Sequence, residues 1–197
     1  RDLNIMQPNQ SLAQSAASIL TGLDAVLTDL EPDWVLVQGD TTTVMVGSLA
    51  AGYRRIRIGH VEAGLRTNDK WQPFPEEINR RITSVIADLH FAPTEEARQN
   101  LLLENIPSKS IVVTGNTAID TLRMSGDQPL TDDVKHILGA VGNRDLILVT
   151  AHRRENFGEP IESICQALKS LAETFRNSVS LVYPVHLNPN IQEPVHR

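Results

Sequence analysis

The sequence has little cysteine, no long apolar run and no excess of positive charge, and each shortage argues against a class of protein. The single thiol among 197 residues, Cys165, cannot form an intramolecular disulfide and agrees with a reducing cytoplasm. No apolar stretch reaches the ~18 residues of a membrane span, and no signal-peptide pattern opens the chain. A formal net charge of −6 gives no support to a nucleic-acid partner. We therefore expect a cytoplasmic globular protein that binds neither membranes nor nucleic acid.

Sequence signatures of cofactor and metal sites are also missing. The chain has no GxGxxG fingerprint and no P-loop, so neither NAD nor ATP is supported. It has no HExxH segment and no close pair of histidines at ligand spacing. Acids and histidines such as Asp40, His60 and Glu62 are of the right type to bind a metal, but their spacing does not favour it. We expect no cofactor and no metal.

The chain does have a regular alternation of short apolar runs with segments of helical periodicity. Ser11 precedes the first helical segment as its N-cap, and Pro32 ends it. Strands are predicted over residues 3–6, 35–37, 56–61, 90–93, 110–114, 146–150 and 179–183. Alternation of this kind predicts the α/β class, with a parallel sheet that carries helices on both faces.

The segment 123–144 differs from the rest of the chain. It is rich in glycine, proline and aspartate and has one short helical stretch, which is typical of a linker. We predict that residues 1–122 form most of a first domain and that residues 145–197 form the first part of a second.

Acidic side chains follow two of the predicted strands directly. Ligands of parallel sheets bind beyond the carboxyl ends of the strands, so we expect Asp40, Glu62 and the loop after residue 150 to meet at one edge. Asp40 could instead cap the helix that follows it, and Glu62 could instead form a structural ion pair with Arg66. Otherwise, a buried carboxyl such as that of Glu62 suits proton transfer.

Two further charged segments can be interpreted in two ways. Glu76 and Glu77 open a helix that begins near Pro75, where the helix dipole favours acids, but the loop before them could also form the wall of a pocket. The turn at residues 152–154 could bind a diphosphate, or it could be a solvated basic turn. His186 follows the next strand at the equivalent place.

The apolar face of the helix after Pro75 is formed by Ile78, Ile82, Val85, Ile86 and Leu89.

Five segments together resemble the non-hydrolysing UDP-N-acetylglucosamine 2-epimerases, in the order and spacing of that family. They are VQGDTTTVMVGSLAA, GHVEAGLRT, PFPEEINRRITSVIADLHFAPTEEARQNLL, VTGNTAIDTL and TAHRREN. The resemblance extends from DLNIM to PVHLNP. It implies two Rossmann-like domains facing a cleft, a glycosyltransferase-B-like arrangement that is truncated here at both ends.

The resemblance implies a reversible reaction at C2 of a nucleotide sugar. UDP leaves by anti elimination, a 2-acetamidoglucal forms, and UDP adds back with C2 protonated on the opposite face. This interconverts UDP-N-acetylglucosamine and UDP-N-acetylmannosamine. The resemblance assigns catalytic roles to Asp40, Glu62, Glu76 and His152. It also implies that Asp40, Glu62, His152 and Arg153 contact the substrate, with His152 near its UDP portion.

The resemblance also implies regulation and assembly. Glu76, Arg153 and His186 match positions at which a second UDP-N-acetylglucosamine activates some members, although those members carry an arginine where this chain has Asn9. Relatives are homodimers that supply units for bacterial surface polysaccharides. The chain lacks the GTRPE-like turn and most of the second domain, so we expect it to be inactive alone. The alternatives are a hydrolysing relative, a glycosyltransferase of the same architecture and a non-catalytic copy.

Overall fold

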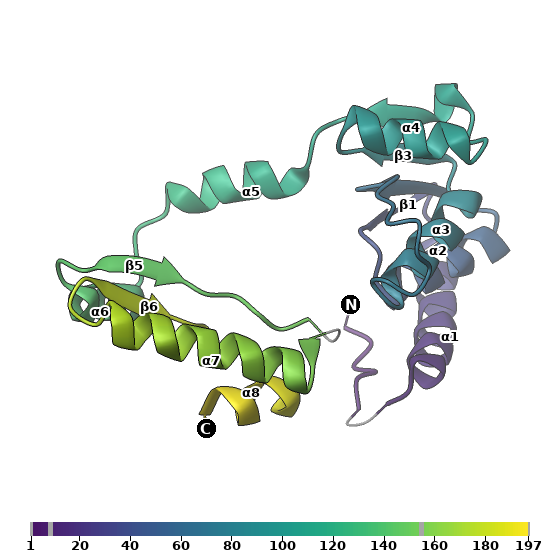
Figure 1. Ribbon diagram of the computed structural model, residues 1–197. Coiled ribbons are helices and arrows are strands. Elements are labelled where there is room, and N and C mark those ends of the chain that lie inside the picture. The colour runs from purple at the N-terminus through teal and green to yellow at the C-terminus, as the bar shows by residue number, and fades with distance from the viewer. Residues whose placement is uncertain (1, 8–9, 154–155, 197) are drawn as a thin grey trace. The chain divides into compact units, whose positions relative to one another are not determined.

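The computed structural model describes residues 2–7, 10–153 and 156–196, which belong to two compact units (Figure 1). Unit 1 ends at Gly126 and unit 2 begins at Asp127, within the segment 123–144. Each unit contains a parallel sheet with connecting helices, which confirms the α/β class. Within the described ranges, no helix has both the length and the apolar character needed to cross a membrane.

Unit 1 is built on a four-stranded parallel sheet in the order β1-β2-β3-β4. Its strands are Trp34–Gln38 (β1), Arg57–Val61 (β2), Leu89–Ala92 (β3) and Ile111–Val113 (β4). Its helices are Leu12–Leu30 (α1), Thr42–Tyr53 (α2), Glu76–Ile86 (α3), Glu95–Leu103 (α4) and Thr117–Gly126 (α5), with a 3₁₀ turn at Ser108–Ser110. Ser11 caps α1 in a full capping box with Gln14, as predicted.

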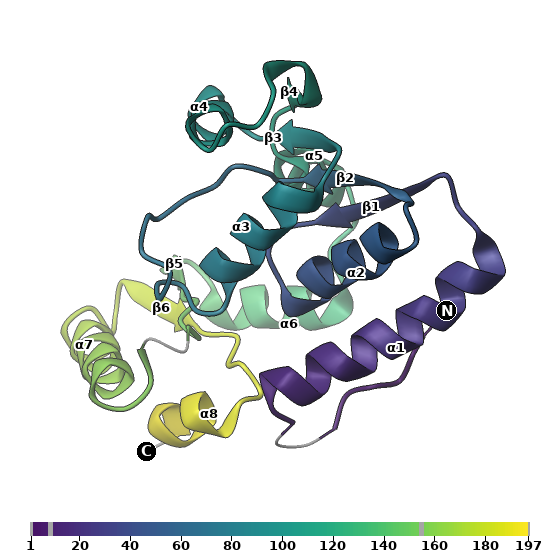
Figure 2. The ribbon, with the colours of Figure 1, turned by 90° about the vertical axis from the view of Figure 1, so that its right-hand side faces the viewer.

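The helices that connect the strands cover one face of the sheet, because successive right-handed crossovers advance in the same direction. Helix α1 packs on α2 (Figure 2). One apolar cluster joins these two helices to β2, and a second joins α4 to β3 and β4. The opposite face of the sheet exposes Trp34, Leu36 and Val112, so the second layer of helices that we expected is not seen over these residues.

The strand predicted over residues 3–6 is wrong. This segment pairs with no strand in the described part of the chain. The side chain of Leu3 instead packs on α1, where its Cδ1 lies 3.0 Å from the position of a Cβ built on Gly22. A short apolar run becomes a strand only where a sheet edge is available to it, and here a helix is the nearer apolar surface.

Helix α3 begins where it was predicted, but its apolar face is not its buried face. Ile82 and Val85 are 41% and 79% exposed, whereas Glu77 and Arg80 are 0% and 7% exposed. The polar face is buried because it lies against α2 and the loop after β2, where partners of opposite charge and backbone groups satisfy it. This arrangement places charged side chains beneath the carboxyl edge of the sheet.

Unit 2 has a two-stranded parallel sheet, so the loops that follow its strands leave from the same edge. Its elements are Asp132–Val141 (α6), Asp145–Leu148 (β5), Glu159–Thr174 (α7), Val179–Val182 (β6) and Pro189–His196 (α8). The hydroxyl of Tyr183 donates to the carbonyl of Ala151 and fixes the start of the loop after β5. Burial raises the pKa of the half-buried Cys165 thiol on α7, and the charge of Glu162 adds to the effect, which agrees with a packing role.

Candidate active site

The carboxyl ends of β1 and β2 are tied together at Gly39. The Gly39 amide donates to the Val61 carbonyl at 3.0 Å, and His60 Nε2 donates to the Gly39 carbonyl at 2.8 Å. Gly39 has a φ of +81°, which glycine adopts at little cost, and a Cβ built there would lie 3.7 Å from Glu62 Oε2. Asp40 and Glu62 come next along their strands, so the two acids leave the sheet side by side.

Asp40 does not cap α2. The N-cap is Thr41, whose hydroxyl accepts from the Val44 amide at 3.3 Å. The backbone carbonyl of Asp40 accepts from Asn79 Nδ2 at 2.9 Å, and its carboxylate lies 3.7 Å from a terminal nitrogen of Arg80. The capping alternative is therefore wrong, and the Asp40 side chain remains 33% exposed.

Glu62 does not pair with Arg66. Arg66 instead forms a bidentate pair with Glu104, with nitrogen–oxygen distances of 2.8 and 2.7 Å. Glu62 has a φ of +68°, an uncommon conformation outside glycine that concentrates at functional sites. The ion-pair alternative is wrong, and the Glu62 carboxylate has no cationic partner among the residues that the structure describes.

The turn after β4 completes this edge of the sheet. Asn116 Oδ1 accepts from the Ala118 amide at 2.8 Å, which directs its Nδ2 toward Glu62 Oε1 at 3.5 Å. The neighbouring Thr117 hydroxyl accepts from Gln38 Nε2 at 2.9 Å. The turn after β4 is thus joined to Gln38 at the end of β1 and to Glu62 directly after β2.

His60 lies fully buried next to the Gly39–Asp40 turn. Burial is the main cause that lowers its pKa from 6.5 to about 4; the charges of His90 and Arg66 lower it further, and the hydrogen bond to Gly39 offsets part of the change. Nε2 carries the proton because the carbonyl can only accept, so Nδ1 is bare, and it has no hydrogen-bond partner within the described ranges. His60 therefore acts as a neutral support for the turn.

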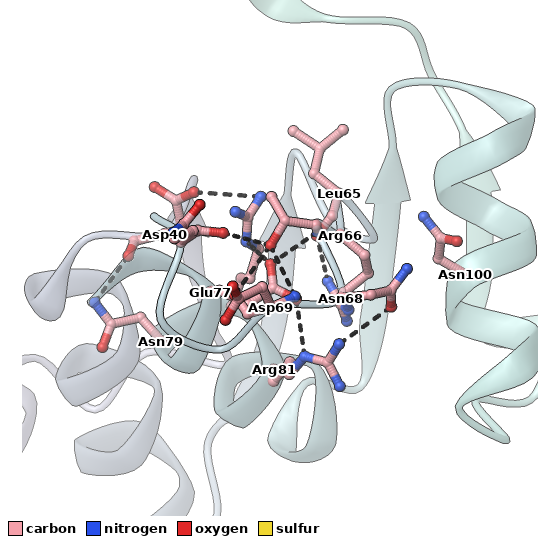
Figure 3. Close-up of polar contacts among 12 residues, drawn as sticks. Asp40, Leu65, Arg66, Asn68, Asp69, Glu77, Asn79, Arg81 and Asn100 are labelled. Atoms are coloured by element: carbon pink, nitrogen blue, oxygen red, sulfur yellow. Dashed lines mark hydrogen bonds and ion pairs between the residues drawn. The ribbon is translucent and has the colours of Figure 1, made fainter. Parts of the chain in front are cut away.

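Glu76 and Glu77 have different surroundings. Glu77 is fully buried and accepts from the Thr67 amide at 3.2 Å and from Arg81 Nε at 2.9 Å (Figure 3). Glu76, at the first position of α3, is half-buried, and its carboxylate forms no hydrogen bond or ion pair with another described residue. Of the two acids, Glu76 is the one whose carboxylate is free to meet a ligand.

In unit 2 the two predicted histidines lie together. The rings of His152 and His186 stack with centroids 5.3 Å apart and an interplanar angle of 13°. The Asn188 amide donates to His186 Nδ1 at 3.1 Å, and Thr150 Oγ1 lies 3.5 Å from His152 Nδ1. These contacts orient both rings at the edge where β5 and β6 end.

Some predicted positions cannot be placed. Arg153 is exposed beside His152, but Arg154, Glu155 and Asn9 lie outside the described residues. In the described ranges, no three His, Cys, Asp or Glu side chains are grouped so that they could hold a metal ion.

Comparison with known proteins places this geometry in a family. All of residues 1–197 match the family described as UDP-N-acetylglucosamine 2-epimerase. The chain belongs to this family. UDP-N-acetylglucosamine 2-epimerases from Salmonella typhimurium and Bacillus subtilis are 55% and 53% identical over the whole chain. The chain spans about half the length of these curated relatives, 54% of the first and 50% of the second.

A solved structure of the same family agrees. The UDP-GlcNAc 2-epimerase from Neisseria meningitidis, bound to UDP-GlcNAc, is 48% identical and has a TM-score of 0.93. The similarity covers 99% of this chain and 54% of that one. The resemblance of the five sequence segments to the UDP-N-acetylglucosamine 2-epimerases is confirmed.

The buried contacts of Glu77 with Thr67, Arg80 and Arg81 were missed from the sequence, because the helix dipole alone could account for this acid. Asn79 and Asn116 were missed as well. One signal was available: Glu77, Arg80 and Ser84 recur at the i, i+3 and i+7 spacing of one helix face. A stripe of such polar residues beside an equally regular apolar stripe leaves open which of the two is buried.

Proposed function

We propose that the complete protein carrying this chain interconverts UDP-N-acetylglucosamine and UDP-N-acetylmannosamine. The observation that supports this most is the adjacency of Asp40 and Glu62 at the ends of neighbouring parallel strands. Asp40 does not cap α2, and Glu62 does not form an ion pair with Arg66, so neither structural alternative accounts for these acids. The family of the chain and the bound sugar nucleotide in the Neisseria relative support the substrate.

The proposed reaction is an elimination followed by an addition. One carboxylate takes the C2 proton, the C2–H electron pair forms the C1=C2 double bond, and the C1–O bond breaks with its pair leaving on UDP. The 2-acetamidoglucal then accepts UDP again at C1, while an acid delivers a proton to the other face of C2. We propose that Asp40 and Glu62 flank C2 for these two proton transfers and that Glu76, at the start of α3, takes part as a third acid.

Two side chains of unit 2 suit the leaving group. We propose that His152 and Arg153 contact the UDP portion, where a hydrogen bond from the imidazole and the positive charge of Arg153 stabilise the departing diphosphate. We further propose that Glu76, Arg153 and His186 belong to a site for a second, activating UDP-N-acetylglucosamine. The proposed enzyme needs no cofactor, works as a homodimer in the cytoplasm and shows little turnover as the 197-residue chain alone.

The test is to incubate the complete protein with UDP-N-acetylglucosamine in deuterated water. Elimination and re-addition predict both UDP-sugars with deuterium at C2. Unlabelled products would contradict the elimination, and free UDP with free N-acetylmannosamine would favour a hydrolysing relative. Transfer of the sugar to an added acceptor would favour a glycosyltransferase, and a folded protein without turnover would favour a non-catalytic role.

A further inference from the structure

The buried carboxylate of Glu77 is the strongest charged feature that the proposed reaction does not use. Its Oε1 accepts from Arg81 Nε at 2.9 Å, and its Oε2 accepts from the Thr67 amide at 3.2 Å. Oε2 also lies 2.9 Å from Arg80 Nε, although the N–H is not aimed well enough to make a hydrogen bond. One carboxylate therefore joins two arginines of α3 to the loop that follows Glu62 (Figure 3).

The carboxylate of Glu77 stays charged in spite of its burial. Burial by itself would raise the pKa of Glu77, but the hydrogen bonds from Arg81 and Thr67 and the charges of Arg80 and Arg81 outweigh it, so the pKa is lowered. A buried charge is retained only where partners compensate its lost hydration. Glu77 is thus a fixed negative charge inside the fold.

Arg80 connects this fixed charge to Asp40. The Arg80 side chain is 9% exposed; it contacts Glu77 through Nε, and its NH1 lies 3.7 Å from Asp40 Oδ2. Asn79, the residue before it, donates to the Asp40 carbonyl. The two anions compete for one guanidinium, and the closer contact to Glu77 holds Arg80 back from Asp40. Without the charge of Glu77, Arg80 would be drawn onto Asp40 and would withdraw that carboxylate from the substrate.

We propose that Glu77 is a positioning residue for the epimerisation, acting on Asp40 through Arg80. It does not touch the substrate. The inference rests on the proposed function, because it assigns Glu77 to the same site and gives its charge a role in that reaction.

The first test is Glu77→Gln in the complete protein. Glutamine keeps the size of the side chain and removes its charge. We expect kcat to fall by about 10- to 100-fold, the scale of a catalytic group misplaced by about an ångström, with KM changed by less than about threefold. Rates are measured well below the unfolding temperature of each variant, with the folded fraction checked by circular dichroism.

The matched control is Glu104→Gln. Unlike the fully buried Glu77, Glu104 is partly buried; it forms a bidentate pair with Arg66 and lies 3.8 Å from Arg81, and neither of these arginines contacts Asp40 in the described structure. We expect this variant to be destabilised with kcat within about twofold of the wild type. An equal loss of kcat in both variants would show that general loosening of unit 1 is the cause and would overturn the inference.

The decisive measurement repeats Glu77→Gln in an Asp40→Asn background. If Glu77 acts through Asp40, Glu77→Gln lowers kcat by less than about threefold in the Asp40→Asn background. The same 10- to 100-fold cost in both backgrounds would overturn the inference while leaving the proposed function intact. A near-normal rate for Asp40→Asn alone would instead contradict the role of Asp40. If Glu77→Gln does not fold, Arg80→Lys takes its place with the same expected pattern.

Discussion

The buried imidazole of His60 makes the stability of unit 1 depend on pH in a defined way. The pKa of His60 is about 4 in the folded chain, against an ordinary value of 6.5 in the unfolded chain. At a pH between these two pKa values, His60 is protonated in the unfolded chain and neutral in the folded chain. The contribution of neutral His60 is therefore fully present above pH 6.5 and is lost as the pH falls toward 4.

The size of the effect follows from this gap. Each pH unit between the two pKa values is worth about 1.4 kcal/mol, so the loss is about 3 kcal/mol. Physically, protonation would place a charge at Nδ1, which is buried and has no acceptor among the described residues. A loss of this size is a large part of the 5–15 kcal/mol by which a typical domain is stable.

The matched variant is His60→Gln, in which the amide nitrogen can still donate to the Gly39 carbonyl but cannot titrate. Urea unfolding followed by tryptophan fluorescence reports on unit 1, because both tryptophans, Trp34 and Trp71, lie there. The difference in the free energy of unfolding between wild type and variant should fall by about 3 kcal/mol from pH 7 to pH 4. Acids such as Glu77 titrate in both proteins and cancel in this difference. Parallel stability curves would refute the account of His60 as a neutral buried support.

Two other substitutions test the packing around the site by the same unfolding assay. Arg66→Ala breaks a buried ion pair and leaves Glu104 without its main partner, so it should lower the free energy of unfolding by about 3 kcal/mol. Arg98→Ala breaks a more exposed pair and should lower it by less than about 1 kcal/mol. Similar losses in the two variants would contradict the importance of burial at Arg66. Gly64→Ala should cost at least about 3 kcal/mol, because Gly64 has a φ of +88° and its new Cβ would lie 2.2 Å from the Ala97 carbonyl oxygen. Gly126→Ala, which meets open space, is its control, and a neutral Gly64→Ala would show that this turn can relax.

Apart from the strand predicted over residues 3–6, the sequence was enough to predict the order of the strands and helices, because periodicity and capping are local properties. It also predicted that Asp40 and Glu62 would follow strands of one parallel sheet at the same edge, but the loop after residue 150, expected at that edge too, follows a strand of a separate sheet. It could not predict the partners of the arginines. Arg66 lies four residues from Glu62 in sequence but pairs with Glu104, 38 residues away, because the glycine turn carries it toward α4.

The buried face of α3 was beyond sequence reasoning for a different reason. Both of its stripes have helical spacing, and hydrophobicity favours burial of the one that includes Ile82 and Val85. In the structure, contacts with Thr67, Arg80 and Arg81 compensate the lost hydration of the buried Glu77 carboxylate. Compensation between segments distant in sequence is a tertiary property, and it is the feature on which the positioning of Asp40 depends.

The central claim is that Asp40 and Glu62 move the proton at C2, and the rate of deuterium incorporation at that carbon tests it most directly. In deuterated water, Asp40→Asn and Glu62→Gln versions of the complete protein should each label C2 at least about 100-fold more slowly than the wild type, while remaining folded and binding UDP. Labelling at near wild-type rates in either variant would contradict the assignment of that residue to the proton transfer.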